Sequence, residues 1–371
     1  MASGNAFLIA ALPGDGIGIE VTDACLAVLE ALCNRAGTFA LQVDTLPAGA
    51  GHFRETGSAL PEETLEIAKK ADAILFGAMG LPEVRTDEGT EIQPQLDLRV
   101  MLDLYAGVRP IRAMPGVPAP LKDPRAGGID LVIVREQTEG LFSDVGKVRV
   151  ENETAVDRMV ITRRGSKRVV DFAFGLAARR KRDGHRGLVT CIDKANVLAS
   201  TAFFRKIFLE RAARHPGIEA QCMYVDAASL NLVRAPWQFD VLVTENMFGD
   251  ILSDLCAGLV GGMGLAPSAD IGDDHALFQP CHGSAPDIAG RDLANPTAML
   301  LSAVLMLEWL SQRHGIGALN DAAALLDGAI REGYASGHIR PAEFGGPDGT
   351  KAVAKKVIGL MRNAESVIGD S

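Results

Sequence analysis

The sequence lacks the patterns that mark secreted, membrane-spanning or nucleic-acid-binding proteins. Its six cysteines form no CxxC pair and lie singly among apolar residues, which is typical of buried, reduced thiols in a cytoplasmic protein. No basic segment precedes the short apolar run near the N-terminus, so we expect no signal peptide. The longest apolar stretch, residues 298–307, is too short to span a bilayer. The formal net charge of −10 gives no general attraction for nucleic acid or anionic membranes.

Strand-like and helix-like segments alternate along the 371 residues, which favours a layered α/β fold with about two domains. Helical spacing of apolar side chains predicts a helix from Ile17 to Asn34. Asn295 and Pro296 open a second long helix, and Gly315 is placed to end it. Runs of apolar residues predict buried strands at 6–12, 71–79, 130–136, 188–193 and 239–246.

Residues 148–170 alternate between polar and apolar side chains, with a turn expected at Arg164 and Gly165. This pattern predicts a long hairpin arm. An isolated hairpin is only marginally stable in water. We therefore expect the arm to pair with another subunit.

Three glycines, Gly14, Gly16 and Gly18, lie between the first expected strand and the first expected helix. This is the context of a dinucleotide-binding fingerprint, but the spacing is GxGxG rather than GxGxxG. No strand ending in an acidic residue follows at the distance of about 20 residues that the fingerprint requires. We interpret the loop as a tight strand-to-helix turn, which argues against an ordinary Rossmann dehydrogenase.

Asp250 and Asp254 are four residues apart and would share one face of a helix. Two like charges there cost stability unless a cation offsets them. Asp226 follows another apolar run and is a candidate third oxygen ligand. Three carboxylates suit a hard divalent ion that keeps open positions for water or substrate. For each aspartate alone, helix capping or solvation is the alternative.

Four basic residues follow or flank expected strands and helices. Arg99, Arg109 and Arg135 offer planar forks that pair with carboxylates, and Arg135 directly follows a buried run. Lys194 follows the expected strand 188–193 and is expected at the start of a helix, where it is a candidate general base. Solvation at the surface is the alternative for each of them.

Taken together, these segments resemble the β-decarboxylating dehydrogenase family, which includes isopropylmalate, isocitrate, homoisocitrate and tartrate dehydrogenases. The similarity is greatest to the isopropylmalate and tartrate enzymes. It covers nearly the whole chain, and the order and spacing of its motifs are specific. The matching motifs are LPGDGIG (12–18), LR…LYAGVRP (98–110), VREQTEG (134–140), DKANVL (193–198), VTENMFGDILSD (243–254) and HGSAPDIAG…NPT (282–297).

The resemblance implies an α/β, isopropylmalate dehydrogenase-like fold of two domains with a large mixed sheet, distinct from the ordinary Rossmann fold. Residues 1–104 and 261–371 would form the cofactor-binding domain. Residues 105–260, with the arm at about 148–170, would form the substrate, metal and dimerisation domain. The family also implies a homodimer with shared active sites, to which Lys194 and Asp226 come from the neighbouring subunit.

The resemblance also implies a role for each candidate residue. Arg99, Arg109 and Arg135 would bind the carboxylates of a small dicarboxylate substrate, and Lys194 would accept its hydroxyl proton. Asp226, Asp250 and Asp254 would hold Mg²⁺ or Mn²⁺. The cofactor loop would comprise His282, Gly283, Ser284, Ala285, Pro286, Asp287 and Ile288, with Asn295 at the adenine. An aspartate at 287 accepts hydrogen bonds from ribose hydroxyls and repels a 2′-phosphate, so NAD is expected rather than NADP.

The sequence departs from the family at three places. Phe142 stands where the family has a tyrosine that donates a proton. Either another acid donates this proton, with Tyr105 and Tyr224 as candidates, or decarboxylation is slowed. Gln93 and Gln95 stand near positions that receive the substrate's substituent. Gly107 replaces an asparagine.

We therefore expect NAD- and metal-dependent oxidation and decarboxylation of a 3-substituted malate, with 3-isopropylmalate as the first candidate. The glutamines leave a tartrate- or malate-type dehydrogenase as the alternative, since buried amides need polar partners. A catalytically silent regulatory subunit is a third possibility. It would require lost ligands or a lost base, and all of them are present.

Overall fold

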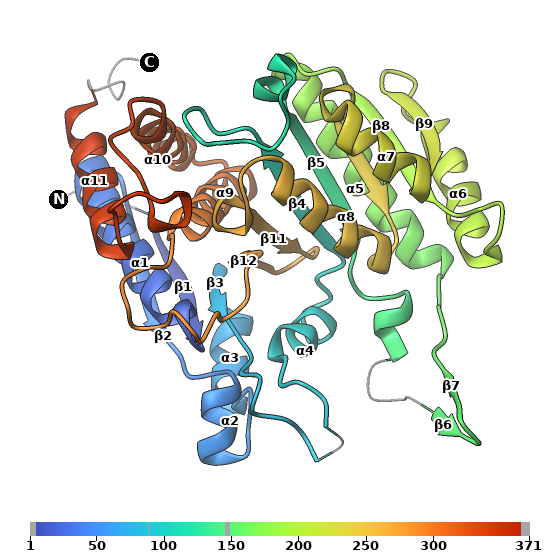
Figure 1. Cartoon of the computed structure of the whole chain (residues 1–371), viewed down its shortest axis with the longest axis horizontal. Helices are drawn as coiled ribbons and strands as arrows, with labels where there is room; N and C mark the ends of the chain where they lie inside the picture. The colour runs from blue at the N-terminus through green and yellow to red at the C-terminus, as the bar shows by residue number, and fades with distance from the viewer. Residues whose placement is uncertain (1–4, 88, 145–148, 365–371) are drawn as a thin grey trace.

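The computed structural model describes residues 5–87, 89–144 and 149–364. Within these residues ten strands form one sheet that runs from β2 at the left of Figure 1 to β9 at the right. In spatial order the strands are β2 (Phe39–Thr45), β1 (Asn5–Gly14), β3 (Ala73–Ala78), β12 (Ala276–Pro280), β11 (Pro267–Ile271), β4 (Ala106–Arg112), β5 (Asp130–Glu136), β10 (Val241–Thr244), β8 (Leu188–Asp193) and β9 (Glu219–Tyr224).

The sheet is mixed, as the family resemblance implied. β11 runs antiparallel to both β12 and β4, and β4 runs antiparallel to β5, whereas the other neighbouring pairs are parallel. Strands from the two chain ends occupy one end of the sheet, and strands from residues 105–260 occupy the other. The sheet is continuous across both groups of strands, so the expected division into two domains stays a prediction.

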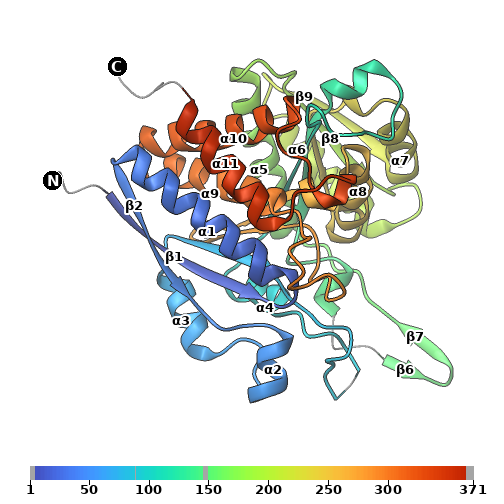
Figure 2. The same ribbon diagram turned by 60° about the vertical axis from the view of Figure 1, so that its left-hand side comes forward.

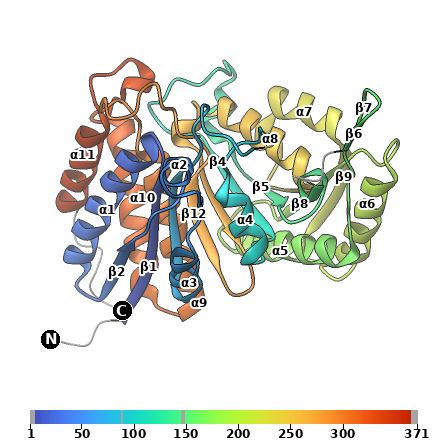
Figure 3. The same cartoon turned by 90° about the horizontal axis from the view of Figure 1, so that it is seen from below.

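Helices cover both faces of the sheet, and Figure 3 shows α7 and α8 on one side of β8 and α5 on the other. The helices are α1 (Ile17–Ala36), α2 (Ala50–Thr56), α3 (Glu62–Lys70), α4 (Pro94–Met101), α5 (Arg163–Arg182), α6 (Ala199–Ala212), α7 (Val225–Arg234), α8 (Asn246–Leu259), α9 (Thr297–His314), α10 (Gly317–Ala335) and α11 (Thr350–Asn363).

Alternate residues of the strands pack on opposite faces of the sheet, as the two-residue period of a strand requires. Phe7 and Ile9 of β1 belong to the large core under α1, α5, α6, α9, α10 and α11. Ala10 and Leu12 belong to a second cluster with residues of α3 and α4. A third cluster lies between the far half of the sheet and α7 and α8. The central strands are thus buried on both faces, whereas the edge strands β2 and β9 are largely exposed.

Both long helices that the sequence predicted are confirmed. α1 begins at Ile17 and ends before Gly37, which takes a left-handed conformation with φ 64°. α9 ends before Gly315 at φ 69°, and the Asn295 side chain accepts hydrogen bonds from the backbone and hydroxyl of Thr297. No helix in the described part of the chain is long and apolar enough to cross a membrane.

The predicted extent of the hairpin arm is wrong. The hairpin consists of β6 (Arg149–Glu151) and β7 (Thr154–Val156), and its turn lies at Asn152 and Glu153, which have positive φ. It projects from the body of the molecule (Figure 2). The Arg164–Gly165 segment instead lies in the first turn of α5, because Thr162 caps that helix and apolar residues follow at helical spacing. Residue 148 lies outside the described residues.

The six cysteines are all free, but only some are buried as predicted. Cys25, Cys191 and Cys256 are buried. Cys33, Cys222 and Cys281 are partly exposed. Cys222 lies beside Cys191 and Asp193, and Cys281 lies beside Arg109. The spacing of the cysteines did not predict these neighbours.

Glu308 of α9 predicts a pH-dependent stability. Burial, together with the negative charge of Asp327, raises the pKa of its carboxyl from 4.5 to about 7. The folded chain therefore retains this proton to higher pH than the unfolded chain does, and stability falls as pH rises from about 4.5 to about 7. Glu308→Gln removes this loss. In thermal or urea unfolding, we expect the variant to gain about 1–3 kcal/mol over the parent between about pH 5 and pH 8. A pH-independent difference would contradict this assignment.

Candidate active site

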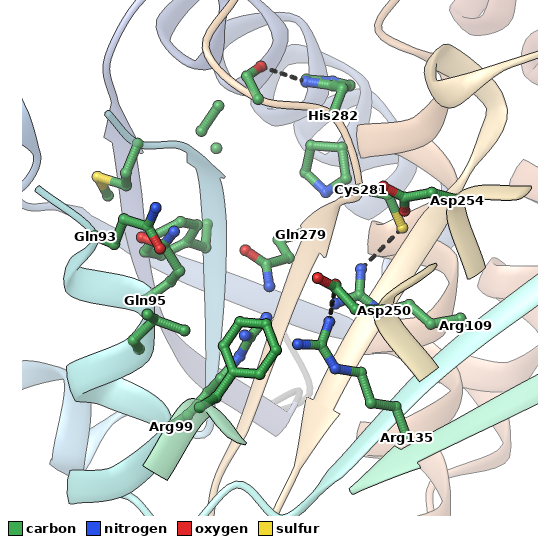
Figure 4. A pocket seen from close by; sticks show the side chains of 18 residues that line it. Gln93, Gln95, Arg99, Arg109, Arg135, Asp250, Asp254, Gln279, Cys281 and His282 are labelled. Carbon is green, nitrogen blue, oxygen red and sulfur yellow. Dashed lines mark hydrogen bonds and ion pairs between the residues drawn. The ribbon is translucent and has the colours of Figure 1, made fainter. Parts of the chain in front are cut away.

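A pocket opens between α4 and α8, where the carboxyl ends of β3 and β12 meet (Figure 4). The sequence predicted ten of the residues that line it: Gln93, Gln95, Arg99, Arg109, Arg135, Phe142, Asp250, Asp254, His282 and Gly283. Segments that lie far apart in the sequence therefore converge here. The predicted catalytic residues Lys194 and Asp226 do not line the pocket, and neither do the predicted cofactor residues from Ser284 onward.

A buried aspartate that the sequence did not single out organises one side of the pocket. Asp270 of β11 is fully buried, and its Oδ2 accepts a hydrogen bond from Arg99 Nε at 2.8 Å. Gln137 and Gln279 also donate to this carboxylate. Burial raises the pKa of Asp270, but the charges of Arg99 and Arg109 and the hydrogen bonds from Arg99 and Gln137 together lower it by more, so that it stays ionised. Asp270 therefore fixes the Arg99 side chain at the pocket wall.

Arg135 is held on the opposite side by the first turns of α8. Its Nε and Nη2 donate to Asn246 Oδ1 at 2.9 and 2.7 Å, and its Nη1 pairs with Asp250. Burial and the nearby charge of Arg99 lower its pKa to about 10, which leaves it charged at neutral pH. A bidentate anchor on an amide leaves the guanidinium little freedom, so its position is set before any ligand binds.

Arg109 is the third arginine that lines the pocket. Its Nη1 is 2.9 Å from Cys281 Sγ, and its Nη2 is 3.9 Å from Asp270 Oδ1. Its buried Nε has no hydrogen-bond partner among the described residues. A buried donor without a partner is costly in a folded protein unless a ligand satisfies it.

The charged groups of the pocket balance one another. Three buried guanidiniums face three carboxylates, namely Asp270 and the pair on α8. Burial and the negative charge of Asp250 raise the pKa of Asp254. A divalent cation would offset the repulsion between Asp250 and Asp254, and carboxylate oxygens are its preferred donors. The residues present thus fit a hard divalent ion.

Lys194 and Asp226 form a separate pair. β8 ends at Asp193, and Lys194 lies in the loop that follows, so the prediction that it starts a helix is wrong because α6 begins only at Ala199. Its Nζ is 2.8 Å from Oδ1 of Asp226 in the first turn of α7. The hydrogen bond from Lys194 lowers the pKa of Asp226. The three predicted metal ligands are therefore divided between two places on this chain.

The structure places two of the sequence departures, the glutamines at the pocket and Gly107 behind it. Gln95 Oε1 is buried and has no hydrogen-bond partner among the described residues, whereas Gln93 donates to Glu91. At Gly107, a Cβ would lie 1.7 Å from Gln137 Nε2. The glycine therefore makes room for Gln137. The Gln137 side chain occupies the space that a larger residue at 107 would need, and it donates to Asp270.

The predicted cofactor loop borders both the pocket and a second cleft. His282 lines both, and its buried Nε2 has no partner in the described part of the chain. The cleft continues along mainly apolar side chains to Ile288 and Asn295. Open space surrounds the Cα of Gly283, which would allow a ligand to approach the backbone closely. A nucleotide fits this cradle.

The remaining predicted cofactor residues differ in exposure. Asp287 is exposed, while Ser284 is buried, and its carbonyl accepts from Ile17 N at 2.7 Å. A Cβ at Gly16 would lie 2.0 Å from that carbonyl oxygen, so the glycine loop serves close packing against the cofactor loop. Ala285 takes a positive φ of 35°, and Pro286 beside it is exposed.

Asn295 is more constrained than the sequence suggested. Its Nδ2 donates to Tyr334 and to Glu343, and its Oδ1 binds Thr297. Its side chain therefore stabilises the start of α9, and a hydrogen bond from it to adenine would have to replace one of these contacts.

Sequence reasoning missed Asp270 and Asp15. Asp15 accepts backbone hydrogen bonds from Ala50 and Gly51 at the start of α2 and from Gly80 after β3, so it joins the glycine loop to both segments. An aspartate within an apolar strand, as in PSADI, is the signal that could have revealed Asp270. Asp15 lay in the glycine loop and gave no comparable signal.

Comparison with known proteins decides the family. The family model described as isocitrate/isopropylmalate dehydrogenase matches residues 8–357. The chain belongs to this family. It is therefore an oxidative decarboxylating dehydrogenase, and enzymes of this family use NAD and a divalent metal ion. Its mixed α/β architecture is that of the isocitrate and isopropylmalate dehydrogenases, which confirms the predicted fold class.

Several individual members are similar over almost their full length. A 3-isopropylmalate/3-methylmalate dehydrogenase of Methanocaldococcus jannaschii is 44% identical, over 95% of this chain and 98% of the relative. A homoisocitrate dehydrogenase of the same organism is 41% identical, over 95% and 97%. The crystal structure of isocitrate dehydrogenase from Methylococcus capsulatus superimposes with a TM-score of 0.84 at 38% identity, covering 96% of this chain and 99% of that one.

Proposed function

We propose that this family member is an NAD-dependent, Mg²⁺- or Mn²⁺-dependent dehydrogenase that oxidises and decarboxylates a 3-substituted malate, with 3-isopropylmalate as the first candidate. The observation that carries the proposal is the pocket itself. Three buried guanidiniums and two carboxylates on α8 face one another beside the His282 loop. The names of the similar enzymes, which include isopropylmalate, methylmalate and homoisocitrate dehydrogenases, support this class of substrate.

The arginines would hold the two carboxylates of the substrate. Arg99 and Arg135 are fixed by Asp270 and Asn246, so they can bind without losing much side-chain freedom. Arg109 also lines the pocket, and its buried Nε has no hydrogen-bond partner among the described residues. Because the charges of the pocket already balance, a dianion and a divalent cation could enter together with little net change in charge.

Asp250 and Asp254 would hold the cation, and the third ligand, Asp226, would come from a second copy of the chain. When bound, the ion would supply positive charge that stabilises a developing oxyanion, and the dinucleotide would supply the hydride acceptor. Lys194, paired with Asp226, would enter the same pocket from that partner and accept the hydroxyl proton. The separation of this pair from the pocket supports a homodimer with shared sites, for which β6 and β7 offer a projecting arm.

NAD is the proposed dinucleotide, and Asp287 is the proposed selector. Its exposed carboxylate stands in the His282 loop, where it would accept hydrogen bonds from the ribose hydroxyls. Replacing Asp287 by lysine together with Ile288 by tyrosine should shift the ratio of kcat/KM for NADP over NAD upward by about 10²-fold, because a repulsive charge becomes attractive. Initial rates with both nucleotides measure this ratio. Asp292→Lys, also near the loop, is the matched control and should leave this ratio unchanged. An unchanged ratio in the Asp287→Lys, Ile288→Tyr variant would mean that the ribose does not bind at Asp287.

Phe142 should limit proton donation after decarboxylation. Its ring centre lies 5.1 Å from the guanidinium carbon of Arg135, and it lines the pocket without a proton to give. None of the three tyrosines lines the pocket, although Tyr224 immediately precedes α7 near Asp226 and could arrive with the partner.

We expect Phe142→Tyr to increase the ratio of CO₂ released to NADH formed, because general acid catalysis contributes about 10²–10⁴-fold. The ratio is measured by trapping CO₂ while following NADH absorbance. Phe142→Leu removes the ring without adding an acid and should not raise the ratio. An equal ratio in parent and tyrosine variant would mean that the protonating acid lies elsewhere.

The orphaned Oε1 of Gln95 favours a second candidate, a tartrate- or malate-type substrate. A buried acceptor without a partner would bind a substrate hydroxyl, and an isopropyl group would leave it unsatisfied. Comparing kcat/KM for isopropylmalate, tartrate, malate and isocitrate with NAD and Mg²⁺ tests both candidates. Preference for isopropylmalate supports the first and preference for tartrate or malate the second. No turnover with any of them, as for a silent regulatory subunit, would contradict the proposal.

A further inference from the structure

Two cysteines face each other on the outermost pair of strands. Cys191 of β8 and Cys222 of β9 are register partners, and both side chains lie with Asp193 in a group whose donor atoms are all within 4.8 Å of one another. Neighbouring strands are about 4.8 Å apart, which is within the range of about 4.4–6.8 Å that disulfide-bonded Cα atoms span. A disulfide between them therefore needs no large movement of the backbone.

The two thiols differ in access. Cys191 is completely buried, whereas Cys222 is partly exposed on β9, which forms the edge of the sheet. A hydrogen bond from Cys191 lowers the pKa of Cys222, and the charge of Arg205 adds to this effect. Burial raises the pKa of Cys191. The accessible sulfur is therefore the better nucleophile, and the buried sulfur lies behind it.

Arg205 argues against a metal ion at this group. Its Nε and Nη2 donate to the two oxygens of Asp193 at 2.7 and 2.8 Å, and Ala195 N donates to Oδ1 as well. A cation would have to displace the guanidinium to use this carboxylate. Two thiols without a free third ligand, beside a fixed positive charge, suit oxidation better than coordination of zinc.

We propose that Cys191 and Cys222 form a redox-active dithiol, a modification site at which a hydroperoxide is the oxidant. The Cys222 thiolate attacks the peroxide and breaks its O–O bond, giving the sulfenic acid of Cys222 and one molecule of alcohol or water. The Cys191 sulfur then attacks the sulfenic sulfur, forming the S–S bond and releasing water. Two thiols are oxidised by two electrons and one peroxide is reduced.

From the position of the dithiol we expect the disulfide to lower the catalytic rate, and this expectation rests on the proposed function. β8 leads directly into Lys194, and β9 leads into the first turn of α7, where Asp226 lies. The cross-link would therefore constrain the two strands that carry the 2.8 Å Lys194–Asp226 pair. Since a displacement of about 1 Å at a catalytic group can cost about 10²-fold, we expect oxidation to lower kcat by about 10-fold or more.

Peptide mapping of the full chain tests the dithiol directly. After treatment with hydrogen peroxide and blocking of free thiols, tryptic peptides 187–194 and 215–234 should appear joined, with a mass two hydrogens below their sum, and dithiothreitol should separate them. Cys191→Ser should instead leave a sulfenic acid on Cys222 that a 1,3-diketone probe labels. Cys222→Ser should give neither product. The partly exposed Cys33, variant Cys33→Ser, serves as the matched control.

Joined peptides in the parent and their absence in Cys222→Ser support the proposal. No joined peptide, with Cys222 reacting no faster than Cys33, would overturn it whether or not the enzyme turns over any malate. Joined peptides with unchanged kcat would overturn the link to Lys194. Equal peroxide inhibition of parent and Cys222→Ser would do so as well, because the inhibition would then arise elsewhere. Absence of turnover by the reduced enzyme would refute the proposed function alone.

Discussion

Replacing Lys194 by methionine is expected to lower kcat about 10²–10⁴-fold and to change the KM for the malate only slightly, because the substitution removes a general base while the arginines remain. Lys194 Nζ is 2.8 Å from Asp226 Oδ1, and its side chain is 27% exposed on the isolated chain, so it is available to a neighbouring pocket. Steady-state kinetics at saturating NAD and Mg²⁺ over a range of pH would measure the change.

The matched control is Lys69→Met. Lys69 forms a similar pair with Glu66, also at 2.8 Å, on the exposed side of α3, away from the pocket. Its loss should leave kcat unaltered, since an exposed pair contributes about 0–1 kcal/mol to stability. If Lys194→Met keeps kcat within about twofold of the parent, Lys194 is not the proton acceptor.

Removing the divalent ion with a chelator should abolish turnover, and Asp250→Asn should raise the Mg²⁺ concentration for half-maximal activity at least about 10²-fold. The amide loses a charged oxygen ligand, and even the outer partners of metal ligands contribute about 10–100-fold to metal affinity. Titration of Mg²⁺ into the metal-free enzyme, followed by NADH formation, measures both effects.

Asp250 also pairs with the buried Arg135, so its loss could unfold the protein instead. Thermal unfolding of the same variant separates the two causes. Asp171→Asn removes a carboxylate from another arginine pair, with Arg211, and should leave the Mg²⁺ titration unchanged. Full activity of the parent in excess chelator, or an unshifted titration of Asp250→Asn, would contradict the proposed metal site.

Local patterns were enough to predict the main strands and both long helices. The periodic burial of β1 and α1 is a property of short segments, and Gly315 ends α9 because a left-handed residue is needed there. The pocket residues were predictable as a set because they lie in motifs whose order and spacing resemble those of a known family. Each alone had an ordinary alternative, as the separate predictions for the arginines and aspartates showed.

Long-range contacts were not predictable from the sequence. Asp270 holds Arg99 across a separation of 171 residues, and no periodicity marks such a pair. The predicted extent of the hairpin was wrong because a local pattern was misleading. Residues 148–170 alternate in polarity, but Thr162 caps a helix whose apolar stripe begins within the same segment. Alternation over short windows does not distinguish a strand from a helix that follows directly.

The central claim is that one active site needs two chains, and subunit complementation tests it most directly. At a Mg²⁺ concentration that saturates only the parent, Lys194→Met and Asp250→Asn chains should each be almost inactive alone, and they would carry their defects in different halves of the site. Coexpressed with different tags and mixed at random, half of their dimers would be heterodimers with one intact site each, so about one quarter of the parent activity should return. Lys194→Met with Asp226→Asn, both in the same half, should recover none. Absence of recovery in the first mixture, with heterodimers isolated and folded, would contradict the shared site.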